Sequence, residues 1–278
     1  MTKWLLFGVI ALLTGCQSPQ RNTIVNHENY RLETLHQAQG ADQRIRFLVM
    51  HYTAEDFHSS LKTLTDEHVS AHYLLPAHPS LQQGKPLAYQ LVPEEMRAWH
   101  AGASSWRGRT HLNDTSIGIE IVNQGFSRTL LGTHWQAYTP EQITLLIQLS
   151  REIIKRYAIE PTNVVGHSDI APQRKQDPGP LFPWQQLAQE GLGAWPDQGD
   201  VERYLAGRDK HAAVPMDRIL VKLARYGYAV EPSWDLKQQR NVLVAFQMHF
   251  RPNDYHGEPD AESEAIIDAL LSKYGSTR

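Results

Sequence analysis

The sequence has little cysteine, no excess of basic charge, and no internal repeat or low-complexity tract. One cysteine among 278 residues excludes an intramolecular disulfide and a cysteine-based zinc ribbon. Lys and Arg number 27 against 30 Asp and Glu, so a dedicated nucleic-acid-binding protein is not expected. The hydrophobic share of 41% is enough for a sizeable core, and the length predicts one or two domains. The 14 histidines stand out, because histidine is a common metal ligand and general acid or base.

The start of the chain has the layout of a secretory signal. Lys3 precedes an apolar run over residues 4–13, and two small residues precede Cys16. This run is too short to span a bilayer, which needs about 20 residues. The order Leu-Thr-Gly-Cys resembles a bacterial lipobox, and the resemblance implies a lipoprotein signal peptide over residues 1–15 and lipidation of Cys16. The alternative is an ordinary buried cysteine.

The residues after Cys16 suggest where such an anchor would hold the protein. Gln17, rather than Asp, follows the cysteine, and by the sorting habit of such lipoproteins this favours the outer membrane, with the protein facing the periplasm. Residues 17–30 are polar, so we interpret residues 16–39 as a lipidated tether.

Hydrophobic patterning predicts an α/β fold in the middle of the chain, a mixed β-sheet flanked by helices. Thr139, Pro140 and Gln142 indicate a helix start, in which Gln142 could complete a capping box. That helix would run to about Tyr157 with one apolar face. The other expected elements are strands at 44–53, 72–75, 88–92, 117–122 and 163–165, and helices at 59–66 and 182–189.

The pattern changes near residue 195. The Gly- and Pro-rich segment 191–200 predicts a linker, so the first globular domain is expected over residues 40–195. Beyond it, helical patterns occur without a strand pattern, which predicts a small all-α domain over residues 200–278. Its expected helices cover 217–227, 235–250 and 260–274.

Three side chains at expected strand ends could form a metal centre. His51 ends one strand, His167 follows another, and Asp177 stands ten residues later before Pro-Gly-Pro. Two histidines and a carboxylate can supply three zinc ligands and leave the fourth position open, which suits amide hydrolysis. Each residue alone has a simpler interpretation: a lone histidine beside a strand is commonly structural, and Asp before Pro is commonly a turn residue.

Four motifs together resemble one known family. They are MHYTA at 50–54, AWHAG at 98–102, LNDTSIGIEIVN at 112–123 and GHSDIAPQRKQDPGPLFPW at 166–184. Over roughly residues 40–190 the chain resembles the zinc N-acetylmuramoyl-L-alanine amidases of the amidase-2 family, whose fold is shared with peptidoglycan recognition proteins. With its lipobox, the whole chain is similar to the outer-membrane lipoprotein amidases of enteric bacteria. Residues 200–278 resemble a three-helix peptidoglycan-binding domain.

The resemblance implies roles for particular residues. His51, His167 and Asp177 match the ligands of one Zn²⁺ per chain. Glu120 matches the acidic residue of the family and is the candidate general base. Lys175 matches the basic residue near the metal and could stabilise an oxyanion. Glu120 lies on the strand face opposite its isoleucine neighbours; the alternative is an outward-facing strand glutamate.

The resemblance also implies a groove that binds substrate. Tyr52, Trp99, His100, His111 and Asn113 fall in motifs that line it in the family, and the aromatic groups suit a sugar face. For Trp99, core packing is an equally good interpretation. Relatives often have arginine in place of His111, so a peptide carboxylate could be bound less tightly here.

Three functions remain open from the sequence. The first is a monomeric zinc amidase that acts on peptidoglycan and muropeptides, anhydro-muramyl forms included, in cell-wall turnover or recycling. The second is a non-catalytic peptidoglycan receptor, which loss of a ligand would indicate. The third is a zinc peptidase. The C-terminal helices would either bind glycan or only pack on the catalytic domain.

Overall fold

The computed structural model describes residues 23–130 and 132–275. The expected signal peptide and Cys16 lie outside the described residues. The chain divides into two compact units, residues 1–42 and residues 43–278, which we describe separately. Among the described residues, no helix is long and apolar enough to cross a membrane.

The described part of the first unit contains a short hairpin. Strands β1 (Ile24–Asn26) and β2 (Arg31–Glu33) pair antiparallel, and all six of their residues are exposed. The turn is closed by a hydrogen bond from the His27 N–H to the Tyr30 carbonyl at 2.9 Å, with the two rings stacked. The sequence predicted only a polar tether here, because an exposed hairpin leaves no pattern of buried residues.

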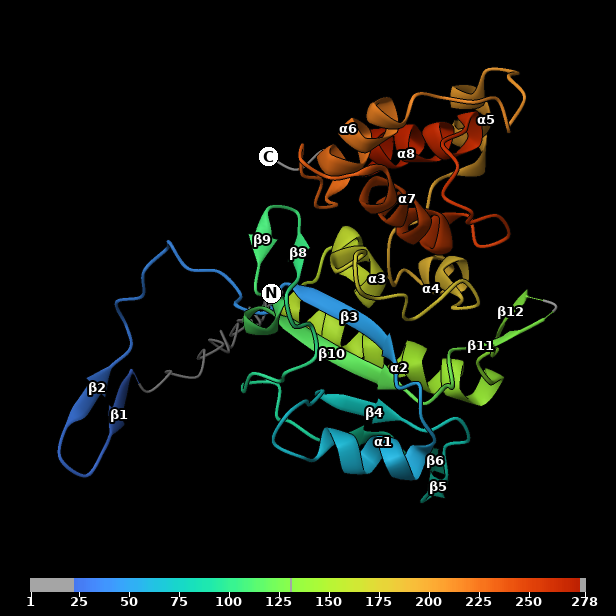
Figure 1. The fold of residues 1–278 in the computed structure, drawn as a ribbon. Coiled ribbons are helices and arrows are strands. Elements are labelled where there is room, and N and C mark those ends of the chain that lie inside the picture. Colours follow the sequence, from blue (N-terminus) through green and yellow to red (C-terminus); the bar gives the residue numbers. More distant parts are fainter. Residues whose placement is uncertain (1–22, 131, 276–278) are drawn as a thin grey trace, which may run out of the picture. The chain divides into compact units, whose positions relative to one another are not determined.

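The second unit is built on a five-stranded mixed sheet in the order β13-β3-β10-β4-β7 (Figure 1). The first four strands of this order run parallel, and β7 is antiparallel to β4. This confirms the predicted fold class. The predicted strand at 88–92 shrinks to two paired residues. The strands are β3 (Phe47–Tyr52), β4 (Tyr73–Leu75), β7 (Tyr89–Gln90), β10 (Ser116–Ile121) and β13 (Val164–Gly166).

Helix α2 (Pro140–Tyr157) lies behind the sheet (Figure 1). Alternate strand residues such as Met50 and Ile119 form one buried cluster with α2. Thr139 caps the helix as predicted, since its hydroxyl accepts from the Gln142 N–H. The capping box is wrong: the Gln142 amide donates instead to the carbonyls of Leu75 and Val122, at 3.2 and 3.0 Å. The Gln142 side chain therefore bonds two strand-end carbonyls instead of the N-cap that the local spacing indicated.

Short elements connect the strands. Helix α1 begins at Phe57, two residues earlier than predicted, because the Asp56 carboxylate caps it by accepting from the Ser59 N–H at 2.9 Å. The hairpins β5/β6, β8/β9 and β11/β12 were not predicted, since two- to four-residue strands show little alternation. The elements are α1 (Phe57–Leu64), β5 (Leu81–Gln82), β6 (Lys85–Pro86), β8 (Ser105–Trp106), β9 (Arg109–Thr110), η1 (Leu112–Asp114), β11 (Phe126–Thr129), β12 (Gly132–Trp135), η2 (Pro161–Asn163), α3 (His167–Ile170) and α4 (Trp184–Gln189).

Four more helices follow in the described part of the chain, and one of them, α7, packs beside α3 and α4 (Figure 1). One hydrophobic cluster joins sheet residues such as Val49 to helix residues such as Phe246 and Ile267. The segment predicted as a linker is therefore packed and partly helical. Trp195 packs on this cluster, and residues 198–200 belong to a helix that was not predicted. The helices are α5 (Gln198–Leu205), α6 (Met216–Tyr226), α7 (Leu236–Phe250) and α8 (Ala261–Tyr274).

Candidate active site

The parallel register brings the expected site residues together at one end of the sheet. Glu120 of β10 is paired with His51 of β3, so the two side chains leave the same face of the sheet side by side. His167 follows the last residue of β13. The loop after α3 returns Asp177 to the same place, where its carbonyl accepts from the Ser168 N–H at 2.8 Å. The carboxyl ends of parallel strands are the usual position for a site in such sheets.

The three predicted ligands form a compact triangle. His51 Nδ1 lies 2.9 Å from His167 Nδ1 and 3.1 Å from Asp177 Oδ2, and the last two atoms are 3.0 Å apart. All three side chains are buried. Zinc bonds of about 2.0–2.1 Å in a tetrahedral site require ligand atoms about 3.3 Å apart. The donor set and its dimensions therefore fit a zinc ion with one open position.

Hydrogen bonds on the far side of the rings fix which nitrogen faces the metal position. His167 Nε2 donates to the Ala101 carbonyl at 3.2 Å. His51 Nε2 lies 3.0 Å from His100 Nδ1, and His100 Nε2 lies 3.1 Å from the Ser116 hydroxyl. That hydroxyl donates to the Leu112 carbonyl, so each imidazole donates outward along the chain. Both ligand Nδ1 atoms then keep a free lone pair, as a metal ligand requires.

The charges of the triangle suit metal binding. Burial, with the nearby His167, lowers the pKa of His51 to about 4, so this ring is neutral at pH 7. Burial alone would raise the pKa of Asp177, but His167 and His51 outweigh it and hold that pKa well below its usual range. A neutral imidazole and an ionised carboxylate are the forms that bind zinc.

Glu120 lies beside this triangle. Burial, together with the charge of Asp177, raises its pKa to about 8, against the opposing effect of Lys175. Its Oε2 is buried and has no hydrogen-bond partner in the described part of the chain. A cation held by Asp177 would oppose the raised pKa. Glu120 is therefore a carboxylate placed to exchange a proton with a bound molecule.

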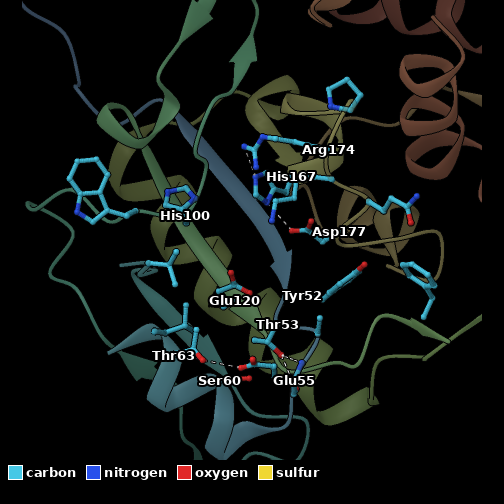
Figure 2. A pocket seen from close by; sticks show the side chains of 18 of the residues that line it. Tyr52, Thr53, Glu55, Ser60, Thr63, His100, Glu120, His167, Arg174 and Asp177 are labelled. Atoms are coloured by element: carbon cyan, nitrogen blue, oxygen red, sulfur yellow. Dashed lines mark hydrogen bonds and ion pairs between the residues drawn. The ribbon is translucent and has the colours of Figure 1, made fainter. Parts of the chain in front are cut away.

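Glu120 and two of the three ligand residues line one groove of about 640 Å³ (Figure 2). Glu120, His167 and Asp177 face it together, and His100 and Tyr52 lie at its walls. Lys175 also lines it. The groove extends beyond them from helix α1 to helix α7. Its remaining walls come from Thr53, Ala54, Glu55, Ser60, Thr63, Leu64, Val69, Ser70, Trp99, Phe126, Pro172, Gln173, Arg174, Gln176, Lys237 and Asn241.

Two expected substrate contacts have different surroundings from each other. Trp99 is 48% exposed and lines the groove, so it is not a core residue, and the Arg97 guanidinium lies 4.1 Å from its ring centroid. His100 is buried, and its ring packs so closely on Gly118 that a Cβ there would lie 2.4 Å from it. His100 therefore supports His51 as well as lining the groove.

Asn113 and His111 are not among the residues that line the groove. Asn113 is buried, and its Oδ1 accepts from the N–H groups of His100 and Ala101, at 3.1 and 2.7 Å. It fixes the loop that carries both groups. His111 is exposed, adopts a positive φ of 55° and contacts the Thr110 hydroxyl at 3.1 Å.

The sequence did not single out Arg174 or Asp169. Arg174 donates to the carbonyls of Ala101 and Ala103 and so ties the loop after α3 to the loop of His100. Asp169, also in the GHSDIAPQRK motif, is buried and bonded to Tyr228, which lies between α6 and α7, and to His249 of α7. Their place in a long family motif could have marked them as important. Their roles were not predictable, because their hydrogen-bond partners lie far away in the sequence.

Comparison with known proteins agrees with this geometry. The Amidase_2 model, described as N-acetylmuramoyl-L-alanine amidase, matches residues 41–180. The chain belongs to the N-acetylmuramoyl-L-alanine amidase family. It is 57% identical to the N-acetylmuramoyl-L-alanine amidase AmiD of Escherichia coli K12, over 98% of both chains. Family membership confirms the prediction that this protein is an enzyme of the N-acetylmuramoyl-L-alanine amidase class.

Solved structures of two relatives have the same fold. A complex of AmiD from E. coli with the substrate anhydro-N-acetylmuramic acid-L-Ala-D-γ-Glu-L-Lys matches with a TM-score of 0.89 and 58% identity, covering 91% of this chain and 98% of that one. AmpDH3 from Pseudomonas aeruginosa matches with a TM-score of 0.79 and 43% identity, covering 90% and 98%. Both matches include the C-terminal helices, because they cover about nine-tenths of this chain.

Proposed function

We propose that this protein uses zinc held by His51, His167 and Asp177 to hydrolyse the amide bond between N-acetylmuramic acid and L-alanine. The observation that carries the proposal is the triangle of buried ligand atoms, 2.9–3.1 Å apart, beside the unpartnered carboxylate of Glu120. An intact ligand set with an adjacent base favours an enzyme over a peptidoglycan receptor, for which neither group is needed.

Each residue of the site has a chemical role in this proposal. Zinc held there would act as a Lewis acid that polarises the amide carbonyl. It would also lower the pKa of the attacking water, so that the water can lose a proton at neutral pH. Glu120 accepts the proton of the attacking water and returns it to the nitrogen of the leaving L-alanine. The Lys175 ammonium, in the same groove, stabilises the negative charge that develops on the carbonyl oxygen.

The substrate class follows from the relative with a bound ligand. The AmiD complex contains an anhydro-muramyl tripeptide, and we propose that this chain acts on the same class, including the anhydro form, in cell-wall turnover or recycling. In such a peptide the γ-linked D-glutamate keeps a free α-carboxylate, and the last residue keeps a second. The leaving peptide therefore carries two carboxylates, together with the ammonium of L-Lys and the released amino group.

Zinc content and murein digestion measured together test this function. Protein starting at residue 17 is expected to hold one zinc per chain and to release intact stem peptides from murein. A chelator is expected to stop the release, and added zinc to restore it, because removing the metal removes the Lewis acid. Metal analysis and mass spectrometry of the products measure both effects.

Other outcomes of that experiment contradict the proposal in distinct ways. Bound zinc without any cleavage indicates a receptor. Shortened stem peptides indicate a peptidase. Cleavage without zinc, unaffected by chelator, means that the ligand assignment to His51, His167 and Asp177 is wrong.

We also propose that the protein is a monomer held at the outer membrane by lipid on Cys16, facing the periplasm. The lipobox-like order before Cys16 supports the anchor, and a protein facing the periplasm would reach a substrate in the cell wall. Full-length protein expressed with labelled palmitate is expected to carry the label, and Cys16→Ser to lose it. The Cys16→Ser protein should then leave the membrane fraction; label retained by this variant would refute the anchor.

Glycan binding by the C-terminal helices stays a prediction. They share a hydrophobic cluster with the sheet, so removal of residues 196–278 would expose core residues such as Val49. Loss of murein binding in that truncation would therefore not identify a binding surface, and point variants are needed.

A further inference from the structure

Helix α7 of the C-terminal segment reaches the catalytic groove. Lys237 and Asn241, four residues apart and so on one face of the helix, line the same groove as Glu120, His167 and Asp177. The N-terminal turns of α7 therefore form one wall of the site, although they come 60 residues after Asp177 in the sequence.

Hydrogen bonds fix this wall to the loop between two zinc ligands. Gln173, which lies between His167 and Asp177, donates from its amide to the Gln238 carbonyl at 2.9 Å. The same side chain accepts from the Asn241 amide at 3.1 Å. Lys237 is next to Gln238, so its backbone is held against the rim of the groove.

The charged groups of the groove are divided between its walls. Its acidic residues are Glu55, near α1, and the central Glu120 and Asp177. Its basic residues are Arg174, Lys175 and Lys237, which belong to the loop after α3 and to α7. Among the lining residues that these two segments contribute, Asp177, one of the three proposed metal ligands, is the only acid.

The three basic side chains differ in whether they already have hydrogen-bond partners in the protein. Arg174 donates to two backbone carbonyls, which fixes its guanidinium. Within residues 23–130 and 132–275, the side chains of Lys175 and Lys237 make no hydrogen bond or ion pair, and Lys237 is exposed. Lys175 is assigned to the reacting carbonyl by the proposed function, which leaves the Lys237 ammonium for another part of the substrate.

We propose that Lys237 is a specificity-determining residue that binds a free carboxylate of the stem peptide. The inference rests on the proposed function, in which the leaving peptide carries one α-carboxylate on γ-linked D-glutamate and one at its end. The wall around Lys237 carries three cationic side chains, and its one acid, Asp177, is a proposed metal ligand. The Lys237 ammonium therefore attracts a carboxylate, and a neutral sugar has no corresponding charge. The C-terminal helices thereby contribute to substrate selection in the catalytic groove itself.

Charge reversal with matched substrates tests this role. Lys237→Glu and Lys237→Gln are assayed on N-acetylmuramoyl-L-Ala-D-γ-Glu-L-Lys and on its analogue with both carboxylates amidated. We expect Lys237→Glu to raise KM for the acidic peptide by about three- to tenfold, and Lys237→Gln by less, because a partly solvated ion pair is modest in strength. The rise should be clearly smaller on the amidated peptide and should weaken at high salt.

Lys210→Glu is the matched control, because Lys210 is an exposed lysine outside the groove and the net charge changes equally. A KM effect shared by Lys210→Glu, or equal on both peptides, would refute the proposal, as would unchanged KM in Lys237→Glu. A change in kcat instead of KM in Lys237→Glu would also refute it, because the carboxylate that Lys237 would bind is remote from the reacting bond. If the unaltered protein cleaves neither peptide, the proposed function itself fails; if it cleaves both, only the role of Lys237 is in question.

Discussion

Glu120→Gln is expected to lower kcat by about 10²–10⁴, the usual contribution of a general base. Glutamine keeps the shape and the hydrogen-bonding oxygen of the side chain but cannot accept the proton of the attacking water. Zinc content should stay at one per chain, because Glu120 is not part of the ligand triangle. Steady-state release of stem peptide, with metal analysis of the same sample, measures both quantities.

Glu55→Gln provides the matched control for this prediction. Glu55 lines the same groove, but its carboxylate accepts from the Thr63 hydroxyl at 3.2 Å, so it is already paired. It should affect kcat far less than Glu120. If Glu120→Gln retains kcat within about twofold, which is below 0.5 kcal/mol of transition-state stabilisation, another group is the base.

The two aligned strands explain why the sequence alone predicted most of the site. His51 lies near the end of a strand predicted from its apolar composition, and Glu120 near the end of a strand with clear alternation; parallel strands place such ends together. His167 and Asp177 belong to one motif and needed only a short loop. Residues whose role depends on local periodicity or a nearby motif were therefore predicted.

The sequence was less informative where a tertiary partner decides the role. Gln142 has capping-box spacing, yet two strand-end carbonyls bind it. Asn113 was expected in the groove, but it accepts from two backbone N–H groups of the His100 loop. A polar side chain can satisfy a buried backbone group anywhere in the fold, and no pattern in the sequence identifies that group.

The C-terminal helices show the same limit over a longer distance. No motif in the sequence marks His249. It is buried, stacked on Trp184 at 3.8 Å, and its Nδ1 lies 2.7 Å from Asp169 Oδ2. Helical periodicity predicted α7 but not its contact with a residue 80 positions earlier. The contact matters because Asp169 belongs to the turn that begins at His167.

Asp169→Ala is expected to lower the free energy of unfolding by about 3–5 kcal/mol, the usual effect of removing one partner from a buried, hydrogen-bonded pair of polar groups. The carboxylate accepts from the Gly166 N–H at 2.7 Å, the Tyr228 hydroxyl at 2.6 Å and His249 at 2.7 Å. Alanine leaves all three donors buried and unpaired. Urea unfolding measures the change. The control Asp200→Ala, which breaks an exposed pair with Arg203, should change it by less than about 1 kcal/mol.

A double-mutant cycle separates this network from a local effect on α3. If the Tyr228 hydroxyl bonds Asp169 as described, Asp169→Ala should cost less in a Tyr228→Phe background, because one donor is already absent. Additive effects would show that the two residues act independently. Because Gly166 and Asp169 flank His167, a loosened turn should also weaken zinc binding, measured by competition with a chelator. Coupled losses of stability and zinc affinity would mean that Tyr228 and His249, which lie beyond the segment matched by the family model, help to hold His167 in place.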